Sequence, residues 1–179
     1  MHKQVPITVF IIVVVSLTSF LIYKMRQSNA ADTRKKWLLK LFFTWYLCAV
    51  AAVTIVPLRV SRTQYLGHHF NFVPVVNSYK RFVNIEKYGD KDGFENFRNN
   101  AIGNIIMFIP MGIFLYSIYK KNFRQVIVIA ALSSALIEFI QFLNMFIGYN
   151  RYVDVDDVIL NTAGACIGFL CWRYWARRK

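Results

Sequence analysis

Seven polar side chains lie in three apolar stretches of the second half of the chain. They are Asn100 and Asn104, then Ser134, Glu138 and Gln141, then Asp157 and Asn161. Glu138 is the most informative of them, because it lies in an apolar run, 126–146, long enough to cross a bilayer. An ionisable group in hydrocarbon costs free energy and is therefore a candidate functional residue. These positions predict a polar site inside a membrane protein.

Helical spacing places these residues on shared faces. Residues three and four apart lie on one side of a helix, so Ser134, Glu138 and Gln141 form one polar stripe. A second stripe combines Asp157 and Asn161 with Gly164 and Gly168, which are spaced as G-x-x-x-G. Such a pair allows a neighbouring helix to approach closely, so we expect Asn161 to hydrogen-bond across a helix contact.

The third apolar stretch has its own packing features. Asn100 and Asn104 repeat the four-residue spacing, and Gly103 and Gly112 permit close approach of another helix. Pro110 frees a backbone carbonyl and predicts a kink.

A short connection, 148–157, carries one arginine and three aspartates above these stripes. One interpretation makes Arg151, Asp154 and Asp157 part of a pocket with Glu138, for a charged or hydroxyl-rich head group. A structural interpretation makes Asp154 a helix N-cap that accepts from the N–H of Asp157. The spacing defines no metal-ligand set, so neither a metal nor a cofactor is predicted.

Glu138 also has a purely structural interpretation. It could pair with Arg151, or be protonated and bonded to Gln141 or Asn161, and so hold helices together. Ser133 and Ser134 have no histidine nearby in the sequence, and no histidine falls in a predicted membrane segment, so an enzyme of the nucleophile type is not indicated. General acid-base work by Glu138 and Asp157 remains open as an alternative.

Composition identifies the class of protein. The chain has 179 residues, of which 56% are hydrophobic and 17% charged. We therefore expect an all-α, polytopic membrane bundle with about five transmembrane helices. Their predicted bounds are 5–23, 37–56, 101–119, 126–146 and 158–175. Residues 1–36 are interpreted as an anchor with a basic linker, and residues 37–179 as the main membrane domain, with an extracytoplasmic loop at 57–99.

Charge predicts the orientation. The net charge is +13, from 22 Lys and Arg against 9 Asp and Glu. The densest basic groups follow the first and third predicted helices and form the C-terminal tail, so these should be cytoplasmic. The N-terminus is then outside, the C-terminus inside, and the polar stripes lie in the outer half of the membrane. No nucleic-acid motif accompanies the charge, so membrane lipid is the expected partner.

Several motifs, taken in order, resemble the VanZ-like family. They are Thr54-Ile-Val-Pro57, Asn71-Phe-Val-Pro74, Gly103-Asn-Ile-Ile-Met-Phe-Ile-Pro-Met-Gly112, Ile137-Glu-Phe-Ile-Gln141 and the run from Arg151 to Gly164. The similarity covers about residues 45–173. It implies an integral protein of the bacterial plasma membrane that confers low-level resistance to teicoplanin and related lipoglycopeptides. Asn71, in the second motif, joins the candidate pocket residues.

Three functions follow as hypotheses. The first is a cell-surface protection protein, whose outward pocket binds a lipid-linked cell-wall precursor or the lipoglycopeptide itself. The second is an intramembrane enzyme that modifies a cell-envelope lipid or precursor. The third is a structural membrane protein whose polar residues hold an assembly together.

Overall fold

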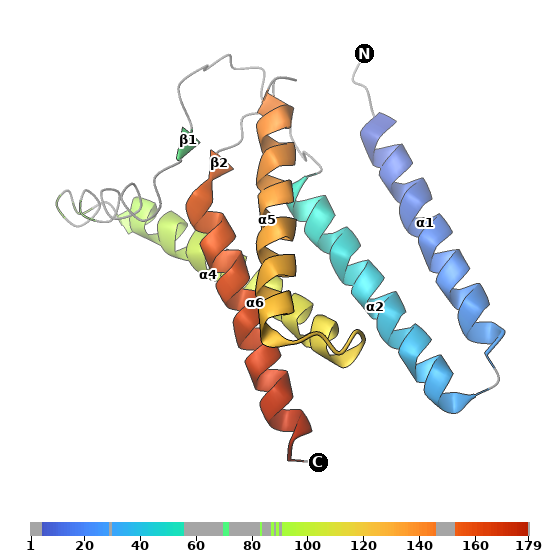
Figure 1. The fold of residues 1–179 in the computed structure, drawn as a ribbon. Helices are drawn as coiled ribbons and strands as arrows, with labels where there is room; N and C mark the ends of the chain where they lie inside the picture. The colour runs from blue at the N-terminus through green and yellow to red at the C-terminus, as the bar shows by residue number, and fades with distance from the viewer. Residues whose placement is uncertain are drawn as a thin grey trace. The chain divides into compact units, whose positions relative to one another are not determined.

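In the part of the chain that the structure describes, the fold is all-helical apart from one pair of very short strands (Figure 1). The computed structural model describes residues 5–28, 30–55, 70–71, 83, 87, 89, 91–145 and 153–178. Within these residues, five helices are long and apolar enough to cross a membrane, as the sequence predicts. The chain divides into two compact units, Met1–Leu58 and Arg59–Lys179.

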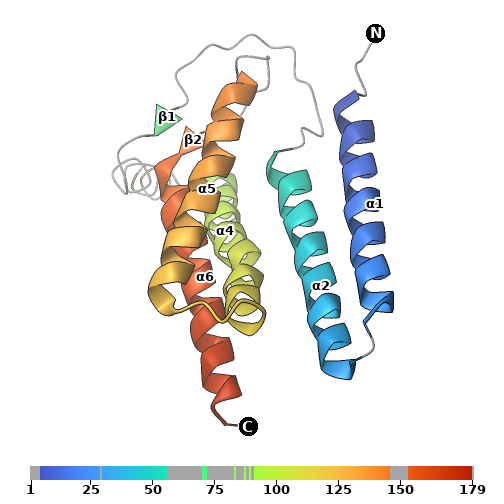
Figure 2. The same ribbon diagram turned by 45° about the vertical axis from the view of Figure 1, so that its right-hand side comes forward.

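The first unit is a hairpin of two helices, α1 (Val5–Arg26) and α2 (Ala31–Thr54), which run side by side in opposite directions (Figures 1 and 2). Trp45 Nε1 on α2 donates to Thr18 Oγ1 on α1 at 3.0 Å. Along α1, apolar side chains such as Ile12 and Phe20 are more than half exposed. Such surface suits contact with lipid chains.

Three long helices are described in the second unit: α4 (Lys91–Ser117), α5 (Phe123–Met145) and α6 (Val155–Ala176). Helix α6 packs against both α4 and α5, and its contact with α4 is the most extensive. The core of the second unit is apolar and contains residues of all three helices. They are Phe108, Met111, Leu115, Val126, Ala130, Ile137, Ala165 and Phe169. Helix α6 is thus the element that positions the other two.

Two strands of two residues each complete this unit. Strands β1 (Phe70–Asn71) and β2 (Val153–Asp154) are parallel, with Phe70 opposite Val153 and Asn71 opposite Asp154. Because β2 leads directly into α6, the pairing fixes a distant segment of the chain beside the start of that helix.

The helix bounds differ from the predicted ones mainly at α4. This helix begins at Lys91, ten residues before the predicted start at Ala101. The first turns are polar, so a search for apolar runs does not detect them, although polar residues form a helix readily outside hydrocarbon. Helical structure continues through Pro110. The orientation of the termini across the membrane stays a prediction.

Candidate functional site

Glu138 lies on α5 and faces the interior of the second unit. Only 7% of its surface is exposed, and its Oε2 accepts a hydrogen bond from the backbone N–H of Asp154 at 3.0 Å. Ser134 and Gln141, which share its helix face, are buried as well. The polar stripe of α5 therefore turns toward protein, which avoids the cost of polar groups in lipid.

Asp154 caps the N-terminus of α6. Its backbone is extended, and its carboxylate accepts from the N–H of Asp156 at 2.9 Å. The sequence predicts this cap but assigns the donor to Asp157, one residue too far. An N-cap side chain can reach the second or the third N–H of the helix, and here it reaches the second.

Asp156 and Asp157 then occupy the first turn of α6, where carboxylates complement the helix dipole. Asp156, one of the three aspartates of the connection, is buried, with 8% of its surface exposed. Its place two residues after a capping aspartate is the sequence signal that identifies it.

Asp157 connects α6 to α4. Asn104 Nδ2 donates to Asp157 Oδ1 at 2.6 Å, and both residues are half-buried. A donor bonded to a carboxylate gives a short, strong hydrogen bond. Asn104 and Asp157, which the sequence places on separate stripes, thus form one contact.

One turn further along, Asn161 connects α6 to α5. Its Nδ2 donates to Ser134 Oγ at 2.8 Å, and the two side chains are 2% and 0% exposed. Asn161 Oδ1 is a buried acceptor that has no hydrogen-bond partner among the described residues. The sequence predicts Ser134 as part of the polar stripe but does not include it among the pocket residues; its position four residues before Glu138 is the signal that identifies it.

Glycines allow α4 and α6 to cross at backbone contact. A methyl group on Gly164 would overlap the carbonyl of Ile105, and one on Gly168 would overlap that of Ile109. From the other side, a methyl group on Gly112 would overlap the carbonyl of Ala165. This close crossing brings Asn104 within reach of Asp157. Gly103 takes no part in it, since no described atom lies within 4 Å of the position of its added methyl group.

The structure says less about the three remaining predicted pocket residues. Asn71 lies opposite Asp154 in the β1–β2 pair. The structure describes only the backbone of Asn71. Asn100 is exposed on α4. Arg151 lies outside the described residues, as does any contact it makes.

The site therefore consists of contacts that all converge on the first two turns of α6. Its described side chains are carboxylates, amides and one hydroxyl, whose oxygens are hydrogen-bond acceptors. Within the described part of the chain, no group of three or more histidine, cysteine or acidic residues is arranged to hold a metal ion. Such a site is suited to ligands with hydroxyl, amide or amine donors.

Comparison with known proteins matches most of the chain to a protein family. A family model described as VanZ/LLP1 matches residues 43–176, a range that begins within α2 and ends with the last residue of α6. No curated protein and no solved structure matches the chain.

Proposed function

The chain belongs to the VanZ/LLP1 family of membrane proteins, and from this premise we propose that it lowers the susceptibility of a bacterial cell to teicoplanin and related lipoglycopeptides. In this proposal the protein resides in the plasma membrane. The polar cluster at the start of α6 faces outward and receives a head group in the outer leaflet.

One observation carries the proposal: buried and half-buried polar groups from three helices converge on the first turns of α6. Glu138 reaches the Asp154 backbone, and Asn104 reaches Asp157. Polar groups inside a membrane bundle cost free energy unless they are paired, and they often mark a ligand or substrate path. The glycine crossing of α4 and α6 holds the groups in place before any ligand binds.

The chemistry of the cluster fits this ligand class. Carboxylate and amide oxygens accept hydrogen bonds from the hydroxyl and amide groups of a sugar-bearing or peptide head group. The lipid part of the ligand would remain in the hydrocarbon beside the exposed apolar faces of the helices. A lipid-linked cell-wall precursor and a lipoglycopeptide share both features.

Antibiotic susceptibility tests the proposal directly. Teicoplanin and vancomycin inhibitory concentrations are measured in cells that express wild type, Glu138→Gln, Asp157→Asn or Arg151→Ala at matched levels. Glu95→Gln is the control, because it makes the same chemical change at an exposed position of α4. We expect wild type and the control to raise the teicoplanin concentration, and the cluster variants to lose most of this rise. An unchanged teicoplanin concentration with wild type contradicts the proposal.

A second measurement on the same cells separates binding from catalysis. Glu138 is a buried carboxyl, so an enzyme that modifies an envelope lipid is the alternative for the same cluster. Mass spectrometry of envelope lipids and precursors with and without expression should show no new species if the cluster only binds. A new species that disappears in Glu138→Gln would establish the enzyme instead.

A further inference from the structure

The end of the second unit opposite the polar cluster carries only positive charge. The segments that meet there, residues 113–128 and 169–178, contain no Asp or Glu. They contain six cations: Lys120, Lys121, Arg124, Arg173, Arg177 and Arg178. All of these are exposed or half-exposed. This end of the unit is therefore uniformly basic, whereas the buried carboxylates Glu138 and Asp156 lie toward the other end.

An aromatic cluster joins the basic residues of different helices. Phe169 of α6 lies 5.3 Å from the ring of Tyr116 and 5.5 Å from that of Phe123, measured between ring centroids. Lys120 Nζ lies 5.8 Å from the Tyr116 ring, and Arg173 Cζ lies 5.9 Å from the Phe169 ring. Cations from the α4–α5 turn and from α6 therefore stand around one set of rings.

The turn between α4 and α5 is locked by hydrogen bonds. The N–H groups of Lys120 and Lys121 donate to the carbonyls of Tyr116 and Leu115, which closes the end of α4. Lys120 has a φ of 52°, at a position that usually belongs to glycine. At the start of α5, Asn122 and Gln125 bond each other's backbone N–H in a capping box. The lysines are thus carried on a fixed backbone.

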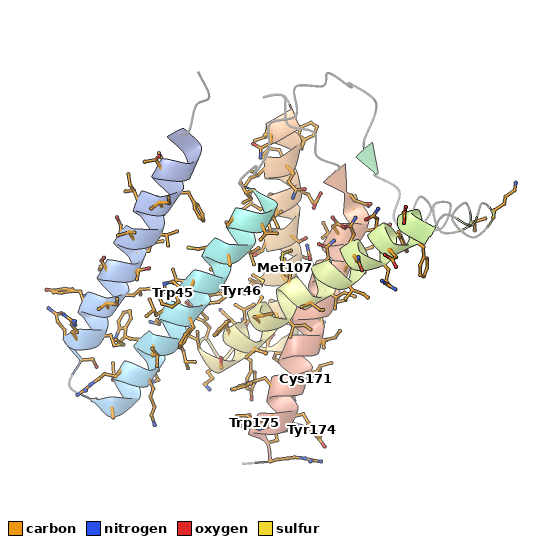
Figure 3. All side chains as sticks on the ribbon, turned by 180° about the vertical axis from the view of Figure 1, so that it is seen from behind. Trp45, Tyr46, Met107, Cys171, Tyr174 and Trp175 are labelled. Atoms are coloured by element: carbon orange, nitrogen blue, oxygen red, sulfur yellow. The ribbon has the colours of Figure 1, made fainter. Side chains whose placement is uncertain are left out.

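Exposed aromatic residues at this end are of the kind found at a membrane surface. Tyr174 and Trp175 are 58% and 47% exposed near the C-terminal end of α6, where Figure 3 labels them. The rings of Trp172 and Trp175 lie 4.7 Å apart, and Arg178 Cζ lies 4.3 Å from the Tyr174 ring. Tryptophan and tyrosine at the end of a spanning helix are typical of the head-group level of a bilayer.

We propose that this basic end, formed by Lys120, Lys121, Arg124 and Arg173, binds the phosphate head groups of anionic phospholipids. Ammonium and guanidinium groups donate to phosphate oxygens, and an arginine can do so through two parallel bonds. Helix dipoles explain part of the charge, because cations are favoured at the C-termini of α4 and α6. They do not explain Arg124, which lies in the first turn of α5, where the dipole disfavours a cation. Attraction to anionic head groups favours a cation at all four positions, including Arg124.

The test uses the purified full-length protein in a neutral detergent. Its thermal unfolding is followed while phosphatidylglycerol, phosphatidylcholine or inorganic phosphate is added. A ligand that binds the folded state raises the midpoint in proportion to the logarithm of its concentration. We expect phosphatidylglycerol to raise it, and the other two to have little effect at equal concentration.

A matched pair of variants assigns the binding to this surface. The triple variant Lys120→Gln, Lys121→Gln and Arg124→Gln should bind phosphatidylglycerol about tenfold more weakly or worse, since each cation contributes to the attraction. The control removes three exposed or half-exposed cations of the first unit, by Lys24→Gln, Lys35→Gln and Lys36→Gln. A second triple variant, Lys120→Arg, Lys121→Arg and Arg124→Lys, keeps the charge and should keep the affinity. Its result stands even if the glutamine variant folds poorly.

Three outcomes would overturn the inference. One is an equal response to phosphatidylcholine, which would mean general lipid stabilisation. Another is saturation by inorganic phosphate at the same concentration, which would identify a simple anion site. The third is an equal loss in the control variant. None of these results bears on antibiotic susceptibility, so this inference and the proposed function fail separately.

Discussion

The carboxylate of Glu138 on α5 accepts a hydrogen bond from the backbone N–H of Asp154 at 3.0 Å, directly before α6 begins. A side chain of one helix thereby holds the start of another. Asp154 also caps α6 and pairs through β2 with β1. One residue therefore connects three segments that are distant in the sequence.

This hydrogen bond predicts different unfolding free energies for two variants of Glu138. Glu138→Gln keeps an acceptor oxygen, whereas Glu138→Leu leaves the Asp154 N–H without this partner. We expect the leucine variant to lose about 1–3 kcal/mol of unfolding free energy and the glutamine variant clearly less. Denaturant unfolding in mixed micelles measures both. Equal losses would mean that the hydrogen bond does not stabilise the fold.

The glycine crossing gives a prediction with its own control. Gly164→Ala and Gly168→Ala would push a methyl group into the α4 backbone, so each should cost about 1–3 kcal/mol or more. Gly103→Ala makes the same change where no described atom is close, and should be neutral or stabilise the helix by up to about 1 kcal/mol. The midpoint of thermal unfolding in detergent ranks the three variants. A loss at Gly103 as large as the others would refute the assigned crossing.

The bond between Asn104 and Asp157 predicts coupling between α4 and α6. A double-mutant cycle with Asn104→Ala and Asp157→Ala should give an interaction energy of about 0.5–2 kcal/mol, the range found for polar contacts between membrane helices. Asn100→Ala replaces Asn104→Ala in a control cycle, because Asn100 is exposed one turn earlier. The control should give an interaction energy near zero. Additive effects in both cycles would contradict the contact.

Replacing Ser134 alone should lower the unfolding free energy more than replacing Ser134 and Asn161 together. Ser134→Ala removes the partner of the Asn161 amide nitrogen, and the amide oxygen has no partner among the described residues, so this change should cost about 1–3 kcal/mol. Adding Asn161→Leu removes the amide that Ser134→Ala leaves without its serine partner. Because leucine is of similar size, the double variant should regain much of the lost unfolding free energy. Unfolding free energies of the two single variants and the double variant decide this. A double variant that loses the sum of both single effects would contradict it.

Several features of the fold could be predicted from the sequence because they depend on local chemistry. Long apolar runs predict the five spanning helices, since a helix satisfies its own backbone hydrogen bonds in hydrocarbon. The spacing of Ser134, Glu138 and Gln141 predicts one polar helix face, because side-chain direction follows from the 3.6-residue turn. The Asp154 cap is predicted on the same basis, although its donor is Asp156.

The partners of these groups were decided by tertiary structure alone. Helical spacing says which residues share a face, but not which helix that face meets, because this depends on crossing and register. Only the structure pairs Glu138 with the Asp154 backbone, Asn104 with Asp157, and the glycines of α6 with the backbone of α4. It also extends α4 back to Lys91 through turns too polar for a hydropathy pattern to detect. The sequence by itself determined which polar groups must face away from lipid, whereas the packing of α6 between α4 and α5 decided which partners they contact.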